Sequence, residues 1–136
     1  MKDNVLVDTS IWIEYFNKPE SPFGPVLDKL IKNGNAFATG VVLTELLQGA
    51  KIEKEFNSIL ESFIALPFLD ATTDTWIKAG KISFSLRRKG ITIPTTDLII
   101  ASLALENNTS VFTLDPHFEK IPDLRLFTPS KTRISG

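Results

Sequence analysis

Short apolar runs alternate along the chain with segments in which apolar residues recur every three or four positions. The first pattern is typical of buried strands and the second of amphipathic helices. Their alternation predicts an α/β fold with a central parallel sheet and helices on both of its faces. We expect strands at about 4–7, 36–39, 110–114 and 124–127, an edge strand at 66–69, and helices at 9–17, 22–33, 53–64, 74–88 and 96–107, besides one that carries Glu45 and stops near Gly49.

The composition favours a folded globule of ordinary size. The chain has 136 residues, and we expect residues 1–136 to form a single domain whose tail, about 130–136, is frayed. A hydrophobic fraction of 43% with ten phenylalanines suits a packed core. The absence of cysteine excludes disulfides, thiolate nucleophiles and cysteine-based zinc sites. With no visible signal peptide and no apolar run near the ~18 residues that span a bilayer, we expect a cytoplasmic protein.

The net charge of −1 gives no global signature of nucleic-acid binding. The balance changes if four acidic residues are neutralised by a metal ion. Setting four of the 16 acidic residues aside leaves 12 against 15 basic residues, a surplus of three positive charges. The near-neutral total is therefore compatible with a polyanionic substrate.

Four acidic residues stand out because of where they lie in the pattern. Asp8 ends the apolar run 5–7, and Asp115 follows the apolar run expected as the strand at 110–114. Glu45 interrupts an apolar helical segment, and Asp97 opens a helix that is otherwise almost entirely apolar. The carboxyl ends of parallel strands are where α/β sheets carry their sites, so these side chains are expected to converge.

Each acid also has a structural interpretation. Asp8 can cap the helix that follows it, and Asp97 can complement the dipole of its own helix. Asp115 precedes Pro116, which is common turn chemistry. Glu45 can lie at a partly exposed boundary or pair with a lysine or arginine. Four converging carboxylates cannot all stay ionised without a counter-charge, and Mg²⁺ or Mn²⁺ prefers such oxygen ligands.

The chain resembles the PIN-domain nucleases and, within them, the VapC-type toxins of toxin–antitoxin pairs. Four segments in the same order carry the resemblance: VLVDTS at 5–10, TELLQG at 44–49, TDLIIA at 96–101 and VFTLDPHF at 111–118. The resemblance implies an α/β/α sandwich, RNA cleavage that depends on Mg²⁺ or Mn²⁺, a homodimer, and inhibition by a small antitoxin that covers the site. It implies a site made of Asp8, Glu45, Asp97 and Asp115, with Thr9, Ser10 and Thr113 close to it.

A metal ion held by carboxylates lowers the pKa of a bound water and stabilises charge on a phosphate. Asp8 and Asp97 are our candidates for direct ligation. Glu45 and Asp115 bind a second metal ion, or they hold the water network and orient the nucleophile. The residues leave both the one-metal and the two-metal mechanism open.

Two further groups of residues have less specific patterns. The helix expected at 74–88 carries apolar residues at helical spacing, and a different arc carries basic residues that either contact phosphates or form a solvated face. The apolar set is Trp76, Ala79, Ile82 and Leu86, and the basic set is Lys78, Lys81, Arg88 and Lys89.

His117 is the lone histidine. It could act as a general base, although a histidine in such a loop is more often structural.

Two other functions fit parts of the pattern. A phosphatase or phosphotransferase could use Asp8 as its nucleophile, as the haloacid dehalogenase-like enzymes do. Their pattern needs a second aspartate two residues on, where this chain has Ser10. A non-catalytic protein-binding module with an acidic pocket is the other alternative, and loss of RNA cleavage on changing Asp8 or Asp97 would distinguish a nuclease from it.

Overall fold

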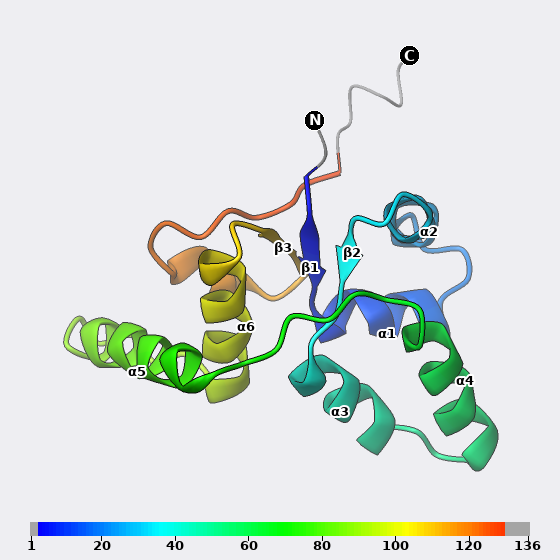
Figure 1. The fold of residues 1–136 in the computed structure, drawn as a ribbon, viewed down its shortest axis with the longest axis horizontal. Coiled ribbons are helices and arrows are strands. Elements are labelled where there is room, and N and C mark those ends of the chain that lie inside the picture. Colours follow the sequence, from blue (N-terminus) through cyan, green and yellow to red (C-terminus); the bar gives the residue numbers. More distant parts are fainter. Residues whose placement is uncertain (1–2, 130–136) are drawn as a thin grey trace.

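The computed structural model describes residues 3–129, so the tail at 130–136, for which we expect fraying, lies outside the described residues. Three parallel strands form a sheet in the order β2-β1-β3, with helices packed around it (Figure 1). The strands are β1 (Val5–Val7), β2 (Ala36–Phe37) and β3 (Ser110–Phe112). The helices are α1 (Thr9–Asn17), α2 (Phe23–Lys32), α3 (Gly40–Gln48), α4 (Glu53–Phe63), α5 (Thr73–Arg87) and α6 (Thr95–Glu106), with a 3₁₀-helix, η1 (Pro116–Lys120). The predicted α/β class is confirmed.

The central strand, β1, is buried along its whole length and pairs on both sides. Val5 is in register with Ala36 of β2 and with Ser110 of β3. Such a strand has no solvent face, which explains why its sequence is continuously apolar and does not alternate. Both partners run parallel to β1, so the carboxyl ends of the strands lie at one edge of the sheet.

Two predicted strands, the edge strand at 66–69 and the last strand at 124–127, are present only as single bridges. Ala38 bridges to Phe68 on one side of the sheet, and Val111 bridges to Leu126 on the other. Each bridge has two backbone hydrogen bonds, one of which the carbonyl of Pro67 accepts from the N–H of Ala38. Proline offers no N–H to continue a ladder, which limits pairing at 66–69. The strand expected at 110–114 ends at Phe112, because the chain turns toward the Asp115 cap of η1.

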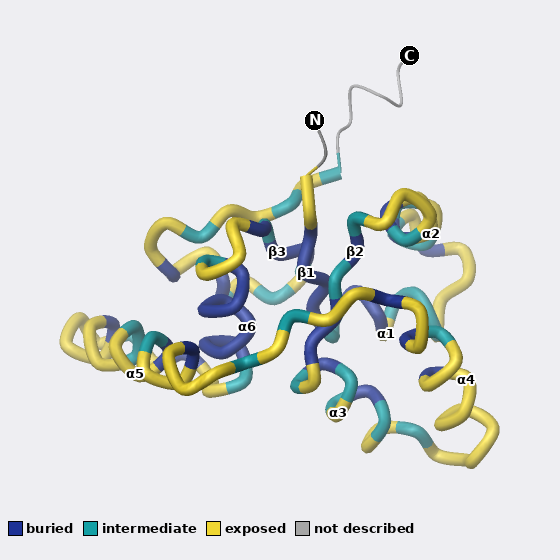
Figure 2. Tube along the Cα trace, viewed as in Figure 1, coloured by how far each residue is buried: buried dark blue, intermediate teal, exposed yellow. Residues whose placement is uncertain are grey.

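Helix α6 is buried on all sides. Eight consecutive residues, from Asp97 to Ala104, are buried, and Figure 2 shows most of this helix in the colour of buried residues, in contrast to α4 and α5. The helix packs against β1, β3, α3 and α5. This confirms the expectation, drawn from its almost uninterrupted apolar sequence, that the helix carrying Asp97 lies in the core. None of the helices within residues 3–129 is long and apolar enough to cross a membrane.

The buried face of α5 differs from the predicted one at Trp76, which is 51% exposed. Thr75 is fully buried in its place. Its hydroxyl accepts a hydrogen bond from the N–H of Thr72 at 3.0 Å and donates one to Glu106 Oε1 of α6 at 2.8 Å. These bonds fix Thr75 toward α6, and adjacent helical residues point about 100° apart, so Trp76 is turned outward.

We predict that Thr75→Val lowers the free energy of unfolding by about 1–2 kcal/mol, because it leaves the N–H of Thr72 and the Glu106 carboxylate without their partner. The matched control is Thr73→Val, since Thr73 is exposed in the same helical turn. Urea unfolding of both variants measures the effect. Equal losses in the two variants would contradict a specific role for the Thr75 hydroxyl.

Candidate functional site

The site begins where β1 and β3 end. Asp8 follows β1 directly, and Thr113 follows β3. The N–H of Asp8 donates to the carbonyl of Phe112 at 2.9 Å, which ties the ends of the two strands together. The sheet therefore fixes the positions of Asp8 and Thr113 relative to each other, although 105 residues separate them in the chain.

Two hydroxyl groups hold the buried Asp8 carboxylate. Thr113 Oγ1 donates to Asp8 Oδ2 at 2.7 Å, and Ser10 Oγ donates to the same oxygen at 2.8 Å. Asp8 also caps α1, but the N–H of Ser10 lies 3.5 Å from Oδ2, at the limit of a hydrogen bond. The other oxygen, Oδ1, accepts no hydrogen bond from any of the described residues. Capping is thus a minor part of what this carboxylate does, and Oδ1 is available to a ligand.

Asp97 and Asp115 complete a cluster with His117. Asp97 lies in the first turn of α6, with its side chain 11% exposed. Asp115 caps η1, and its Oδ1 accepts from the N–H of His117 at 2.9 Å. Its own N–H donates to Thr113 Oγ1 at 2.9 Å, so it belongs to the same network as Asp8. The Nδ1 atom of His117 lies 2.8 Å from Asp115 Oδ1 and 3.5 Å from Asp97 Oδ2.

The pKa values of Asp97 and Asp115 are shifted in opposite directions. Burial, followed by repulsion from Asp115 and Asp8, raises the pKa of Asp97 from 3.8 to about 7. Burial also pushes up the pKa of Asp115, but the hydrogen bond from the N–H of His117 and the nearby His117 ring and Asp97 outweigh this and leave it below its usual range. Two like charges close together cannot both be ionised at low cost, so Asp97 takes up a proton at a higher pH than Asp115 does.

Glu45 joins the network through a hydroxyl group. It is half-buried on α3, and Thr9 Oγ1 donates to its Oε1 at 2.6 Å. The lysine or arginine partner that a purely structural role would need does not occur among the hydrogen bonds and ion pairs of residues 3–129. Because Thr9 adjoins Asp8, the first turn of α1 links Glu45 to the cluster.

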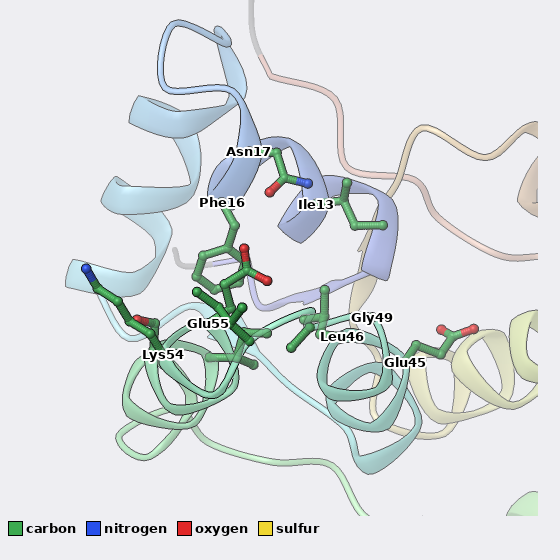
Figure 3. A pocket seen from close by; sticks show the side chains of 12 residues that line it. Ile13, Phe16, Asn17, Glu45, Leu46, Gly49, Lys54 and Glu55 are labelled. Atoms are coloured by element: carbon green, nitrogen blue, oxygen red, sulfur yellow. The ribbon is translucent and has the colours of Figure 1, made fainter.

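A cavity of about 630 Å³ lies between α1, α3 and α4, next to the acidic cluster but not on it. Figure 3 shows Phe16, Leu46 and Ile13 among the residues that line it, with Glu45 at one side. Asp8, Asp97 and Asp115 are not part of its lining. The cavity thus reaches the network at Glu45, and the rest of its lining mixes apolar side chains with charged and polar ones such as Lys54 and Glu55.

The predicted phosphate-binding residues on α5 do not form one group. Thr75 near the start of α5 bonds to Glu106 at the end of α6, and a short connection joins the other ends of the two helices. Figure 1 shows α5 and α6 crossing at a steep angle, and Arg88 follows the end of α5, about 15 Å along the helix from Lys78. Lys81 is exposed between them, and the Arg88 guanidinium lies 5.4 Å from the centre of the Phe84 ring.

The donor set of the cluster fits a divalent cation. One donor atom each from Asp97, Asp115 and His117 lie within 4.8 Å of one another. Carboxylate oxygens suit Mg²⁺ and Mn²⁺, and an imidazole nitrogen is accepted by the transition metals. The sequence analysis considered His117 as a general base, favoured a structural role for it, and did not count it among the metal-site residues. The signal available was its position two residues after Asp115, where the turn at Pro116 brings the ring back to the carboxylate.

Comparisons with known proteins agree with this geometry. The PIN domain family matches residues 5–124. Ribonuclease VapC2 of Rickettsia felis is 30% identical, over 89% of this chain and 94% of the relative, and Ribonuclease VapC of Rickettsia bellii is 32% identical, over 91% and 95%.

Solved structures share the fold of this chain. The crystal structure of VapBC2 from Rickettsia felis, bound to a DNA fragment from their promoter, superposes with a TM-score of 0.79 at 28% identity, and covers 93% of this chain and 98% of the other. DNA-bound VapBC from Salmonella typhimurium gives 0.76 at 27% identity, with the same coverage. The chain therefore belongs to the PIN-domain family and, within it, to the VapC-type proteins.

Proposed function

We propose that this chain is the ribonuclease toxin of a toxin–antitoxin pair and that it cuts RNA with a divalent metal ion, Mg²⁺ or Mn²⁺. The observation that carries the proposal is the convergence of three carboxylates, those of Asp8, Asp97 and Asp115, at one sheet edge. Burial of Asp97, together with repulsion from Asp115 and Asp8, raises its pKa to about 7. Curated relatives of nearly the same length bear the name Ribonuclease VapC, which supports RNA as the substrate.

Asp8 and Asp97 are the proposed direct ligands of the metal ion, with Asp115 and Glu45 holding a second ion or the surrounding water. A bound divalent ion supplies Lewis acidity and lowers the pKa of its water. Ser10 and Thr113 position Asp8 by holding its Oδ2 and leaving Oδ1 open.

In the same way, the Thr9 hydroxyl orients Glu45, whose remaining oxygen can accept a proton or hold a water molecule.

Lys78, Lys81 and Arg88 are proposed contacts for RNA phosphates.

The phosphatase alternative has less support. A nucleophilic Asp8 would need room for direct attack on phosphorus, but the residue is only 4% exposed and one of its oxygens accepts two hydroxyl bonds. Ser10 stands where the second aspartate of that mechanism is required. A non-catalytic module is distinguished by experiment, since it has no cleavage to lose.

We also propose an antitoxin partner, a homodimer, and a single domain that covers residues 1–136. The structural relatives are VapBC complexes, which supports a protein partner for this chain. Phe16 and Leu46 in the cavity next to Glu45 offer a surface for apolar side chains of such a partner, and the acidic cluster offers one for a basic side chain. The cytoplasmic location expected from the sequence stays a prediction.

RNA cleavage by the purified chain is expected to require Mg²⁺ or Mn²⁺ and to stop in EDTA. Asp8→Asn and Asp97→Asn should each reduce the rate by about 10³-fold or more, because each removes a ligand charge worth several kcal/mol in the transition state. Asp70→Asn makes the same chemical change at an exposed aspartate and should leave the rate unchanged. Cleavage that survives EDTA and both site variants would contradict the proposal.

Metal-free Asp97→Asn is expected to be more stable than the parent chain above about pH 7. The pKa of Asp97 is raised from 3.8 to about 7 in the folded state, so the stability that this group contributes is complete below about pH 4 and lost as the pH rises through about 7. We expect a gain of about 1–2 kcal/mol at about pH 8, less than the full shift implies, because water screens part of the repulsion.

Urea unfolding in EDTA, at about pH 4 and about pH 8, measures this difference. The advantage of Asp97→Asn should shrink toward the lower pH, where Asp97 of the parent chain carries its proton. A variant that is less stable than the parent at the higher pH would argue against repulsion within the cluster.

Neutralising the cluster should also weaken antitoxin binding. If a basic side chain of the partner contacts the carboxylates, Asp8→Asn and Asp97→Asn should lower the affinity about tenfold or more, and added salt should narrow the difference. Titration calorimetry of the chain with its antitoxin, with Asp70→Asn as control, measures this. Equal affinities for all four chains would show that the partner does not use the cluster.

A further inference from the structure

The acidic cluster contains one nitrogen donor that the carboxylate site does not require. His117 lies in η1, where the Asp115 carboxylate caps its N–H and the neighbouring Phe118 is buried in the core. Both contacts fix the position of the short helix. The backbone that carries the imidazole is therefore held next to the carboxylates by this hydrogen bond and by packing.

The Nδ1 atom of His117 is buried and makes no hydrogen bond. It lies 2.8 Å from Asp115 Oδ1, but the two groups are not aligned as donor and acceptor. A buried polar atom without a partner costs free energy unless a ligand satisfies it. The side chain as a whole is 43% exposed, so the rest of the ring reaches solvent and only Nδ1 is enclosed.

The separations suit shared ligation of one ion. Two donors that each lie about 2.1 Å from an ion, in neighbouring coordination positions, are about 3 Å apart. Nδ1 lies 2.8 Å from the nearest oxygen of Asp115 and 3.5 Å from that of Asp97. Both separations are close to the value expected for two ligands of one ion.

We propose that His117 Nδ1 is a direct ligand of an ion held between Asp97 and Asp115, either the first ion or the second one proposed above, and that it gives the site a preference for Mn²⁺ over Mg²⁺. This inference rests on the metal-dependent function proposed above. Mg²⁺ takes oxygen ligands almost exclusively, and imidazole nitrogen favours the transition metals. A mixed nitrogen and oxygen site therefore binds Mn²⁺ more tightly than the carboxylates alone would.

The competing interpretation gives His117 no contact with the ion. In that case its ring only neutralises the carboxylates or supports η1, and Nδ1 keeps a proton. Both interpretations predict some change on substitution, so activity alone does not separate them. Direct detection of a metal–nitrogen bond does.

Pulsed electron paramagnetic resonance of bound Mn²⁺ is the decisive measurement. The chain has a single histidine, so in protein without added histidines an imidazole ¹⁴N coupling can come only from His117. We expect the coupling in the parent chain and in Lys120→Ala, which removes an exposed side chain of the same 3₁₀-helix. It should be absent from His117→Ala and His117→Asn.

Calorimetric titration gives the second readout. His117→Ala should weaken Mn²⁺ binding about tenfold or more, and Mg²⁺ binding much less, so that the preference between the ions falls. His117→Asn serves as a second variant if the alanine change unfolds η1. Lys120→Ala should retain the preference of the parent chain.

Bound Mn²⁺ without the imidazole coupling, or an unchanged Mn²⁺/Mg²⁺ preference in both folded His117 variants, would overturn the ligand assignment and leave the proposed nuclease intact. A parent chain that binds neither ion would instead overturn the metal-dependent function itself. The two failures are thus distinguishable in one set of titrations.

Discussion

Repulsion among carboxylates held close together is the constraint on which the site depends. Asp8 and Asp115 follow neighbouring parallel strands, and Asp97 projects from a helix that is buried on all sides. None of these backbones can move away without breaking the sheet or exposing the core. Burial of Asp97 and this repulsion together raise its pKa to about 7, and a bound divalent cation would offset both effects.

Hydroxyl groups fix the orientation of two of the carboxylates, those of Asp8 and Glu45. Ser10 and Thr113 come from opposite ends of the chain and donate to the same oxygen of Asp8, which leaves the other oxygen free. Thr9, the residue after Asp8, donates a hydrogen bond to one oxygen of Glu45. A carboxylate oriented in this way loses little freedom when it binds an ion, so the first turn of α1 serves both as a helix start and as support for the site.

The same cluster links stability to function. An ionised Asp97 destabilises the metal-free fold, whereas an ion that binds only the folded chain stabilises it by mass action. Residues that favour the reaction are thus unfavourable for the empty protein, a common relation at active sites. The ring of His117 lies against both Asp115 and Asp97, so it takes part in the same electrostatic interactions.

The sequence by itself determined the α/β class, the central strand and the buried helix, because continuous apolar runs at 5–7 and 98–105 have few other ways to be buried. It also marked the four acids, since a charge inside an apolar pattern is costly without a role. Only the tertiary structure decided what depends on contacts distant in the chain. Thr75 rather than Trp76 faces α6 because Glu106 bonds to it. In the same way, His117 joins the cluster because the turn at Pro116 folds its ring back onto carboxylates from two different elements, and no local pattern records that.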